Sequence, residues 1–332
     1  MSYTLSLPVF RPLLQVVTRT PWARVWAARV FRACQKLGIN VTPRHFYWPI
    51  PDLEMLSQKD WRACSLSDAV SLQPDKQLLV LEAGLLPFCA ECRFPEQATE
   101  CAHQYHFNNG FFERVDAEVA YAMVRYLLPR RIVEIGSGQT TRLLAAALRR
   151  NAEEGRNGEL MSIEPHPDAV LRHGFPGLSK LAMRRVQEVP MEVFTTLERG
   201  DILFIDSSHV VAMDSDVIHE YLRILPKLRP GVVIHVHDIF LPADYPQKFV
   251  MTNLCFWGEQ YLLEAFLSYN RAFQVLWASS AMQFFHPAEL EKYFPGWAGS
   301  YLRMPENIRT FTPTLDGRNV WPCSFWMRKL AG

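Results

Sequence analysis

Arg131-Ile-Val-Glu-Ile-Gly-Ser-Gly-Gln-Thr-Thr141 is the stretch that decides the fold. A short β-branched run is followed by a Gly-x-Gly turn and then by a helix-favouring run. Gly136 and Gly138 remove Cβ atoms where the chain must turn sharply and approach a ligand closely. A dinucleotide site would have a third glycine, in the pattern G-x-G-x-x-G, where this chain has Thr141. The stretch therefore predicts a strand, a ligand-binding turn and a helix without the dinucleotide fingerprint.

Three later segments repeat the pattern of an apolar strand that ends in an acidic residue. They are Met161-Ser-Ile-Glu164, Asp201-Ile-Leu-Phe-Ile-Asp206 and Gly231-Val-Val-Ile-His-Val-His-Asp238. Apolar runs bounded by polar residues are typical of central parallel strands, and open α/β sheets bind ligands beyond the carboxyl ends of such strands. We therefore expect an α/β fold in which Glu164 accepts hydrogen bonds from ribose hydroxyls and Asp206 and Asp238 converge.

These segments resemble the class I S-adenosylmethionine-dependent methyltransferases, and among them a bacterial small-molecule O-methyltransferase-like group with Asp-x-x-His and His-Asp motifs. The motifs that carry the resemblance are Phe112-Glu-Arg-Val-Asp-Ala-Glu118, Phe204-Ile-Asp-Ser-Ser-His209, Val236-His-Asp-Ile-Phe240 and Trp257-Gly-Glu-Gln-Tyr261. The resemblance implies a methyltransferase (EC 2.1.1.-) with a Rossmann-like seven-stranded, mostly parallel sheet flanked by helices. It also implies that S-adenosylmethionine is bound by Glu134, Gly136, Ser137, Gly138, Glu164, Gln187 and Asp206.

The expected reaction centre contains Asp206, His209, His237 and Asp238. Methyl transfer to oxygen requires that the acceptor hydroxyl lose its proton. Asp206 and Asp238 can hold Mg²⁺ or Mn²⁺, which would lower the pKa of a bound hydroxyl. Similar O-methyltransferases have two consecutive acids where this chain has His237-Asp238, and a histidine favours Mn²⁺, Fe²⁺ or Zn²⁺ over Mg²⁺. Alternatively, His209 or His237 acts as the general base.

The alternation of side chains along a strand also makes a prediction for the fifth strand. His235 and His237 are two residues apart, so they should face the same side of the sheet, with Asp238 on the other side unless the turn reverses it. We interpret His235 as a packing residue of the sheet.

The chain divides into an N-terminal extension and a methyltransferase domain. Residues 1–104 are expected to pack on the core as an extension, and residues 105–332 to form the domain. A loop-rich insertion at 286–322, near the site, separates the two final strands at 273–278 and 324–328, which are expected to pair antiparallel. A third strand is predicted at 182–186.

Composition is that of a globular protein with a large core. The chain has 332 residues, 49% of them hydrophobic, and a net charge of +1, which gives no general attraction to nucleic acid. Seven cysteines, an odd number, without a secretory signal favour a reducing compartment and a cytoplasmic location. No apolar run reaches the ~20 residues of a membrane span.

The N-terminal region and one cysteine cluster allow more than one interpretation. No acid precedes Asp52, and residues 21–37 have a basic, amphipathic helical pattern. The pattern suits peripheral contact with anionic lipid or an organelle transit peptide, but packing on the core or on a second subunit of a homo-oligomer is favoured. A zinc site is a further alternative for a group of cysteines and histidines at the end of the extension and just beyond it, although unligated cysteines that pack as small hydrophobic residues are the commoner case. These residues are Cys89, Cys92, Cys101, His103 and His106.

Two other functions remain as alternatives to small-molecule methylation. Arginine pairs such as Arg130-Arg131 and Arg149-Arg150 suggest nucleic-acid modification, but they lack interleaved aromatic residues and suit helix ends. A non-catalytic interaction protein would be expected to lose Gly136, Gly138 or Glu164, and all three are present. We therefore expect a small-molecule or saccharide-like acceptor.

Overall fold

A computed structural model describes residues 21–42, 49–61, 66–295, 314–315, 318–319 and 322–331. The chain forms two compact units, Met1–Lys59 and Asp60–Gly332. The second unit therefore begins before residue 105, where the methyltransferase domain was expected to start. No helix in the described ranges is long and apolar enough to cross a bilayer.

The first unit contains two described helices, α2 (Pro21–Lys36) and α3 (Leu53–Leu56). The amphipathic helix expected at residues 21–37 is therefore present. Trp22 and Trp26 of α2 are 67% and 64% exposed, and α2 has no acidic residue in its first turn. Asp52 caps α3 by accepting a hydrogen bond from the Glu54 N–H at 3.0 Å. The packing, membrane and transit-peptide interpretations of this region stay predictions.

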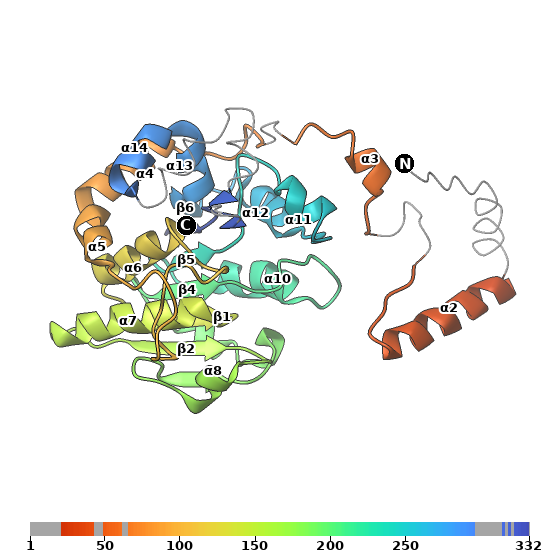
Figure 1. Ribbon diagram of the computed structural model, residues 1–332, viewed down its shortest axis with the longest axis horizontal. Coiled ribbons are helices and arrows are strands. Elements are labelled where there is room, and N and C mark those ends of the chain that lie inside the picture. Colours follow the sequence, from red (N-terminus) through yellow and green to blue (C-terminus); the bar gives the residue numbers. More distant parts are fainter. Residues whose placement is uncertain are drawn as a thin grey trace. The chain divides into compact units, whose positions relative to one another are not determined.

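The second unit is built on a seven-stranded sheet in the order β3-β2-β1-β4-β5-β9-β6 (Figure 1). The first five strands in chain order pair in parallel, and β9 pairs antiparallel with both β5 and β6. The strands are β1 (Arg131–Ile135), β2 (Glu159–Ile163), β3 (Lys180–Ala182), β4 (Ile202–Ile205), β5 (Val233–Val236), β6 (Phe273–Ala278) and β9 (Phe325–Lys329). The predicted α/β class, the seven strands and the antiparallel final pair are confirmed.

Two local predictions differ from the structure. The third strand ends at Ala182, and Gln187 lies in a 3₁₀ turn, η2 (Val186–Glu188), because this edge strand pairs with β2 over only three residues. The stretch expected to be loop-rich contains the helix α14 (Pro287–Tyr293), which has Pro at its first position, where a missing N–H costs nothing. It also contains a two-stranded sheet, β7 (Thr314–Leu315) and β8 (Arg318–Asn319). Residues 296–313 of the expected insertion lie outside the described residues.

A separate hydrophobic core covers each face of the sheet. Alternate residues of one strand enter different cores, Ile132 on one face and Val133 on the other, as strand geometry requires. The first core contains side chains of α4 (Pro74–Val80), η1 (Leu81–Leu85), α5 (Leu86–Glu91), α6 (Asp116–Leu127) and α7 (Gln139–Glu153), all from the amino-terminal half of the chain. The helices α13 (Ser279–Phe285) and α14 contribute to it from the carboxyl-terminal part. Helices that contribute to the second core are η2, α9 (Glu192–Thr195), α10 (Asp216–His219), η3 (Glu220–Ile224), η4 (Leu225–Lys227), α12 (Glu259–Leu267) and, through Ala281, α13. The remaining described helices are α8 (Ala169–His173) and α11 (Gln247–Met251).

Asp201, just before β4, supports the amino-terminal edge of the sheet. Its buried carboxylate accepts hydrogen bonds from the backbone N–H groups of Arg130 at 3.1 Å, Arg131 at 2.9 Å and Glu198 at 2.9 Å. These bonds join the starts of β1 and β4, which lie side by side in the sheet.

Replacement of this carboxylate should destabilise the protein. In Asp201→Ala three backbone donors lose a charged acceptor, and we expect the free energy of unfolding to fall by about 2–4 kcal/mol. The matched control is Glu198→Ala, since Glu198 is exposed and its ion pairs are 3.7 and 3.8 Å long; a change below about 0.5 kcal/mol is expected there. Urea unfolding measures both, and equal losses would contradict the assigned role of Asp201.

Candidate active site

The carboxyl ends of the parallel strands form one row. The register pairs Ile135 of β1 with Ile163 of β2 and with Ile205 of β4, and pairs Ile205 with Val236 of β5. The next residue of each strand is therefore brought to the same edge of the sheet. These residues are Gly136, Glu164, Asp206 and His237. The row brings together the cofactor and reaction-centre residues that the sequence predicts.

The turn after β1 passes very close to the end of β4. Gly136 has φ +80°, and a Cβ placed on it would lie 1.8 Å from the carbonyl oxygen of Asp206. Only glycine fits this close backbone approach. A Cβ on Gly138 would have no atom within 4 Å. The two glycines therefore differ: Gly136 lets two strand ends meet, whereas Gly138 borders open space.

Glu134 lies beneath this turn and braces it. Its buried carboxylate accepts hydrogen bonds from the hydroxyls of Thr140 and Thr141, both at 2.7 Å, and from Ser162 of β2. Burial raises the pKa of Glu134 to about 7. The Thr141 hydroxyl also accepts the Gly138 N–H at 3.0 Å. Glu134 therefore holds the turn in place, and its side chain has no exposed surface with which to contact a ligand directly, as the sequence had suggested it would.

Several polar atoms near the strand ends are available to a ligand. The Ser137 hydroxyl and the Gln187 side-chain oxygen are buried and have no hydrogen-bond partner in the described part of the chain. Glu164, half-buried, uses one carboxylate oxygen to accept the His166 N–H at 2.7 Å. The Gln187 side-chain nitrogen donates to the Asp214 carbonyl at 2.8 Å. The unpaired atoms, together with the open space at Gly138, fit a polar nucleoside cofactor.

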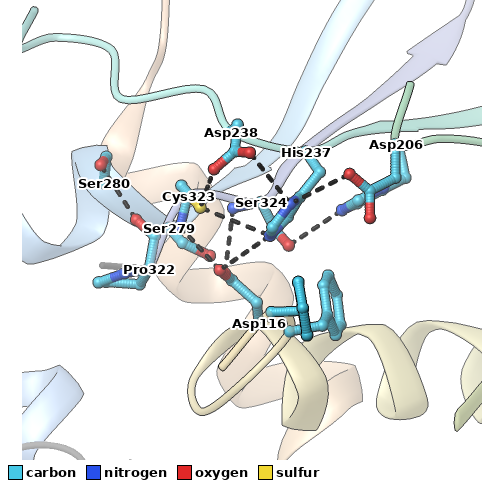
Figure 2. A network of polar contacts seen from close by, with 12 residues as sticks. Asp116, Asp206, His237, Asp238, Ser279, Ser280, Pro322, Cys323 and Ser324 are labelled. Carbon is cyan, nitrogen blue, oxygen red and sulfur yellow. Dashed lines mark hydrogen bonds and ion pairs between the residues drawn. The ribbon is translucent and has the colours of Figure 1, made fainter. Parts of the chain in front are cut away.

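Two acids and two histidines alternate around the predicted reaction centre. His209 Nε2 lies 3.6 Å from Asp206 Oδ1 and 3.2 Å from Asp238 Oδ2. His237 Nδ1 lies 3.4 Å from Asp206 Oδ1 and 3.8 Å from Asp238 Oδ2. Figure 2 shows Asp206 and Asp238 on either side of the His237 ring. Each of the two histidines proposed from the sequence thus contacts both of the proposed acids.

Two residues of this group have left-handed backbone conformations. His209 has φ +60° and Asp238 has φ +54°, values that non-glycine residues adopt rarely. Strand alternation would send Asp238 to the face opposite His237, but the left-handed turn directs its carboxylate back to His209. Such strain is concentrated at functional sites. His235 and His237, by contrast, lie on one face as alternation predicts, with ring centroids 6.0 Å apart.

His209 is held from behind by a buried acid. Its Nδ1 lies 2.8 Å from Glu259 Oε2 at the start of α12, and its carbonyl accepts the N–H groups of Gly258 and Glu259. Burial alone would lower the pKa of His209, but Glu259, Asp238 and Asp206 raise it to about 9. Glu259 was not predicted as a site residue, although it belongs to one of the motifs that carry the resemblance.

His237 and Asp206 stabilise each other's charges. Burial alone would raise the pKa of Asp206, but His237 and His209 lower it to about 2. Burial alone would lower the pKa of His237, but Cys323, Asp206 and Asp238 raise it well above its usual value. Burial raises the pKa of the Cys323 thiol far above its usual range, so the carboxylates are the groups that hold the charge on His237.

His235 is a packing residue, as predicted. Its ring stacks on Phe204 at 3.7 Å between centroids, and its Nε2 lies 2.9 Å from the Ser324 hydroxyl. Burial lowers the pKa of His235 well below its usual value, so this ring is neutral.

The structure does not assemble the alternative zinc site. The thiols of Cys89 and Cys92 are buried and donate to the carbonyls of Glu118 and Ala117 of α6. Cys101 is exposed, and its thiol lies 3.5 Å from His103 Nε2. Among the described residues, the groups of three or more potential metal ligands are Asp206–His209–Asp238 and Asp116–His237–Cys323.

Aromatic side chains border the histidine side of the centre. The half-buried Trp257 ring lies 4.7 Å from the His209 ring. Trp257 in turn contacts Tyr245 at 5.9 Å and Phe249 at 5.5 Å, both edge to face. Loop residues after β5 and residues before α12 thus form an aromatic wall, defined as Tyr245, Phe249 and Trp257.

The comparison with protein families agrees with this geometry. Residues 133–239 match a family model described as a methyltransferase domain. The match begins in β1 and ends just beyond Asp238, so it contains the glycine turn, Glu164 and the acid–histidine group.

Similar proteins were found by sequence and by structure. A protein of Archaeoglobus fulgidus, described as uncharacterized, is 29% identical over 202 residues, covering 57% of this chain and 90% of the relative. A CmcI structure with Mg and S-adenosylmethionine is 17% identical, with a TM-score of 0.31, and covers 51% of this chain and 67% of that chain. An O-methyltransferase from Bacillus cereus in complex with S-adenosylhomocysteine is 16% identical, with a TM-score of 0.33, over 60% of this chain and 82% of that one. Because these TM-scores are low, the fold assignment depends on the sheet order of this chain and not on these structures.

The sheet order, the glycine turn and the family match define a class I, Rossmann-like methyltransferase fold. Residues 133–239 therefore match a methyltransferase domain, in agreement with the resemblance to the S-adenosylmethionine-dependent methyltransferases.

The two turn glycines should respond differently to an added methyl group. Gly136→Ala places Cβ against the Asp206 carbonyl at a positive φ, so we expect a large loss of thermal stability or failure to fold. Gly138→Ala meets no neighbouring atom, so the fold should persist while affinity for S-adenosylhomocysteine falls. Thermal unfolding and calorimetric titration measure the two effects. Unchanged affinity in a folded Gly138→Ala protein would place the cofactor elsewhere.

The raised pKa of His209 predicts a pH-dependent stability of the metal-free protein. A folded-state pKa of about 9, against a usual value of 6.5, stabilises the fold fully below pH 6.5, and this contribution is lost as pH rises through 9. The shift corresponds to roughly 3 kcal/mol. His209→Asn, which tolerates a left-handed backbone, should flatten this decline. Urea unfolding with chelator present at several pH values tests it; an unchanged slope in the variant would refute the assignment.

Proposed function

We propose that this methyltransferase transfers the methyl group of S-adenosylmethionine to a hydroxyl oxygen of a small-molecule acceptor, with the help of a divalent cation. The observation that carries the proposal is the convergence of Asp206, His209 and Asp238 at the carboxyl ends of the parallel strands. Their potential ligand atoms lie within 4.8 Å of one another. Acids this close together require positive charge between them.

The cofactor site of the proposal combines backbone and side chains. Gly136 and Gly138 open the turn, with Ser137 between them, and Glu134 braces it from below. Glu164 follows β2, where a carboxylate can accept the ribose hydroxyls. Gln187 offers its unpaired side-chain oxygen, and this fits an exocyclic amine such as that of adenine. Asp206 ends β4 between this site and the reaction centre.

The cation of the proposal would be held by Asp206 and Asp238, with His209 as a third ligand. Glu259 at His209 Nδ1 favours the tautomer with its lone pair on Nε2, the atom that faces the two acids. Such a cation lowers the pKa of a bound hydroxyl and orients it. One imidazole among two carboxylates favours Mn²⁺ or another transition metal over Mg²⁺.

Without a cation, the histidines hold the positive charge themselves. A His209 pKa of about 9 means that its ring is protonated at neutral pH, so it is a poor general base in that state. A bound metal would displace this proton. The metal-assisted reaction is therefore the better-supported route, and His237 or His209 as general base is the alternative.

The acceptor of the proposal lies against the aromatic wall. Trp257 is near enough to His209 that a ring or sugar stacked on the wall would place a hydroxyl near the acids. Proximity and alignment of this oxygen with the methyl group account for a large part of methyl transfer catalysis. We therefore propose a ring-containing or saccharide-like small molecule as the acceptor.

The first experiment is calorimetric titration with S-adenosylhomocysteine, with and without Mn²⁺ or Mg²⁺. Glu164→Ala should weaken binding about tenfold or more, because it removes a charged hydrogen-bond acceptor. The matched control is Glu159→Ala, at the exposed start of the same strand, which should bind normally. An affinity for S-adenosylhomocysteine that is unchanged in Glu164→Ala would contradict the proposed cofactor site.

The second experiment addresses the cation and the acceptor together. Asp238→Asn should retain S-adenosylhomocysteine binding but weaken Mn²⁺ binding measured by titration. A panel of phenols, sugars and other ring alcohols, followed by mass spectrometry, should show a gain of one methyl group that chelator abolishes and Mn²⁺ restores. Methylation that survives chelation would favour the histidine-base alternative, and methylation of nitrogen alone would overturn the choice of oxygen.

A further inference from the structure

A second group of potential metal ligands lies directly behind the first. Cys323 Sγ is 3.5 Å from His237 Nε2, and Asp116 Oδ2 is 3.8 Å from the same nitrogen. The three ligand atoms all lie within 4.8 Å of one another, and all three residues are buried. Figure 2 shows Asp116 and Cys323 on the side of the His237 ring away from Asp206.

The segment that carries Cys323 is held rigidly. The Asp116 carboxylate accepts the N–H groups of Cys323 at 2.7 Å and Ser324 at 3.1 Å. The Cys323 carbonyl accepts the Ile239 N–H at 2.9 Å, and the Ser280 hydroxyl donates to the Pro322 carbonyl at 3.0 Å. The backbone is thus fixed on both sides of the cysteine, so its thiol is positioned before any metal binds.

We propose that Asp116, His237 and Cys323 form a closed zinc site, separate from the cation site of Asp206, His209 and Asp238. The second site takes a borderline-soft divalent ion through a thiolate, an imidazole and a carboxylate. It rests on the positions of these three side chains and does not require the proposed acceptor chemistry.

The spacing of the ligand atoms suits tetrahedral zinc. Zinc binds thiolate sulfur at about 2.3 Å and imidazole nitrogen at about 2.0 Å, so the two ligand atoms of a tetrahedral site lie about 3.5 Å apart. The observed Cys323–His237 separation is 3.5 Å, whereas the 3.8 Å between Asp116 and His237 must shorten by a few tenths of an ångström. Asp116 keeps a free acceptor position on each oxygen after accepting one N–H.

His237 and Asp238 each present a different atom to each site. His237 Nδ1 faces Asp206, and its Nε2 faces Cys323 and Asp116. A proton on Nδ1, donated towards Asp206, leaves the Nε2 lone pair for zinc. Asp238 Oδ2 faces His209, while its Oδ1 lies 3.4 Å from Cys323 Sγ and can supply a fourth ligand.

The ligand sets select different ions. A thiolate favours zinc strongly and Mg²⁺ hardly at all, whereas the first site has no sulfur. Binding releases the thiol proton of Cys323 and the Nε2 proton of His237 to solvent, and no redox step is involved. Closed, buried zinc sites are structural, so zinc here would join the start of α6, the end of β5 and the start of β9.

Cobalt substitution of the full-length protein tests the site. Co²⁺ bound to a thiolate gives a near-ultraviolet charge-transfer band, which carboxylate and imidazole ligands alone do not give. We expect one such band per chain with Co²⁺ added in excess Mg²⁺, lost in Cys323→Ser and retained in Cys255→Ser. Cys255 is the matched control because it is a partly buried free thiol outside the proposed ligand set. Bound S-adenosylhomocysteine shows that each variant is folded.

The outcomes separate this proposal from the proposed function. Loss of the band in Cys323→Ser with normal S-adenosylhomocysteine binding supports the site. Absence of the band in the wild type, or its persistence in Cys323→Ser, overturns it without affecting the cofactor or acceptor proposals. X-ray absorption of the zinc-loaded wild type gives a variant-independent check: one sulfur per zinc is expected, and a shell of only nitrogen and oxygen refutes the proposal.

Discussion

The candidate active site depends on compensation of the negative charge of several carboxylates gathered in a partly buried space. Asp206 and Asp238 converge at the sheet edge, and Glu259 and Asp116 stand behind the two histidines. Carboxylates so placed would repel one another and take up protons unless cations neutralised them. The pKa of about 2 at Asp206 and of about 9 at His209 show that the two imidazoles provide this compensation. A site that holds its histidines charged in this way is also one in which metal cations can replace protons.

The backbone at the strand ends is arranged to bring these groups together. Gly136 permits contact between β1 and β4 that any side chain would prevent, and His209 and Asp238 adopt left-handed conformations. Each departure costs free energy, which the buried cores on both faces of the sheet supply. Glu134 contributes from below, because the three hydroxyls that donate to it fix the shape of the turn. The residues that shape the candidate site are therefore also residues on which the stability of the fold depends.

The sequence predicted the features that depend on local order along the chain. Strand ends in a parallel sheet share one edge, so Glu164, Asp206 and Asp238 could be placed there from their positions alone. Glu259 and Cys323 could not, because their roles arise from contacts with residues 50 and 86 positions away. The orientation of the Asp238 side chain could not be predicted from the alternation along the strand, because Asp238 itself has a left-handed backbone conformation. The third strand was misplaced because three edge residues carry too little pattern to define its register.

The residue with the most contacts between the two groups of potential metal ligands is His237. An acid at position 237 would add a third oxygen ligand beside Asp206 and Asp238 and suit Mg²⁺. An imidazole instead has two nitrogens on opposite sides of one ring, so His237 can respond to Asp206 and to Cys323 at the same time. The positive charge that Asp206 needs therefore depends on what occupies the far side of the ring. If zinc takes Nε2, its two positive charges replace the two protons that Cys323 and His237 release, so the net charge beside Asp206 is kept while the ring still presents its Nδ1 proton to that carboxylate.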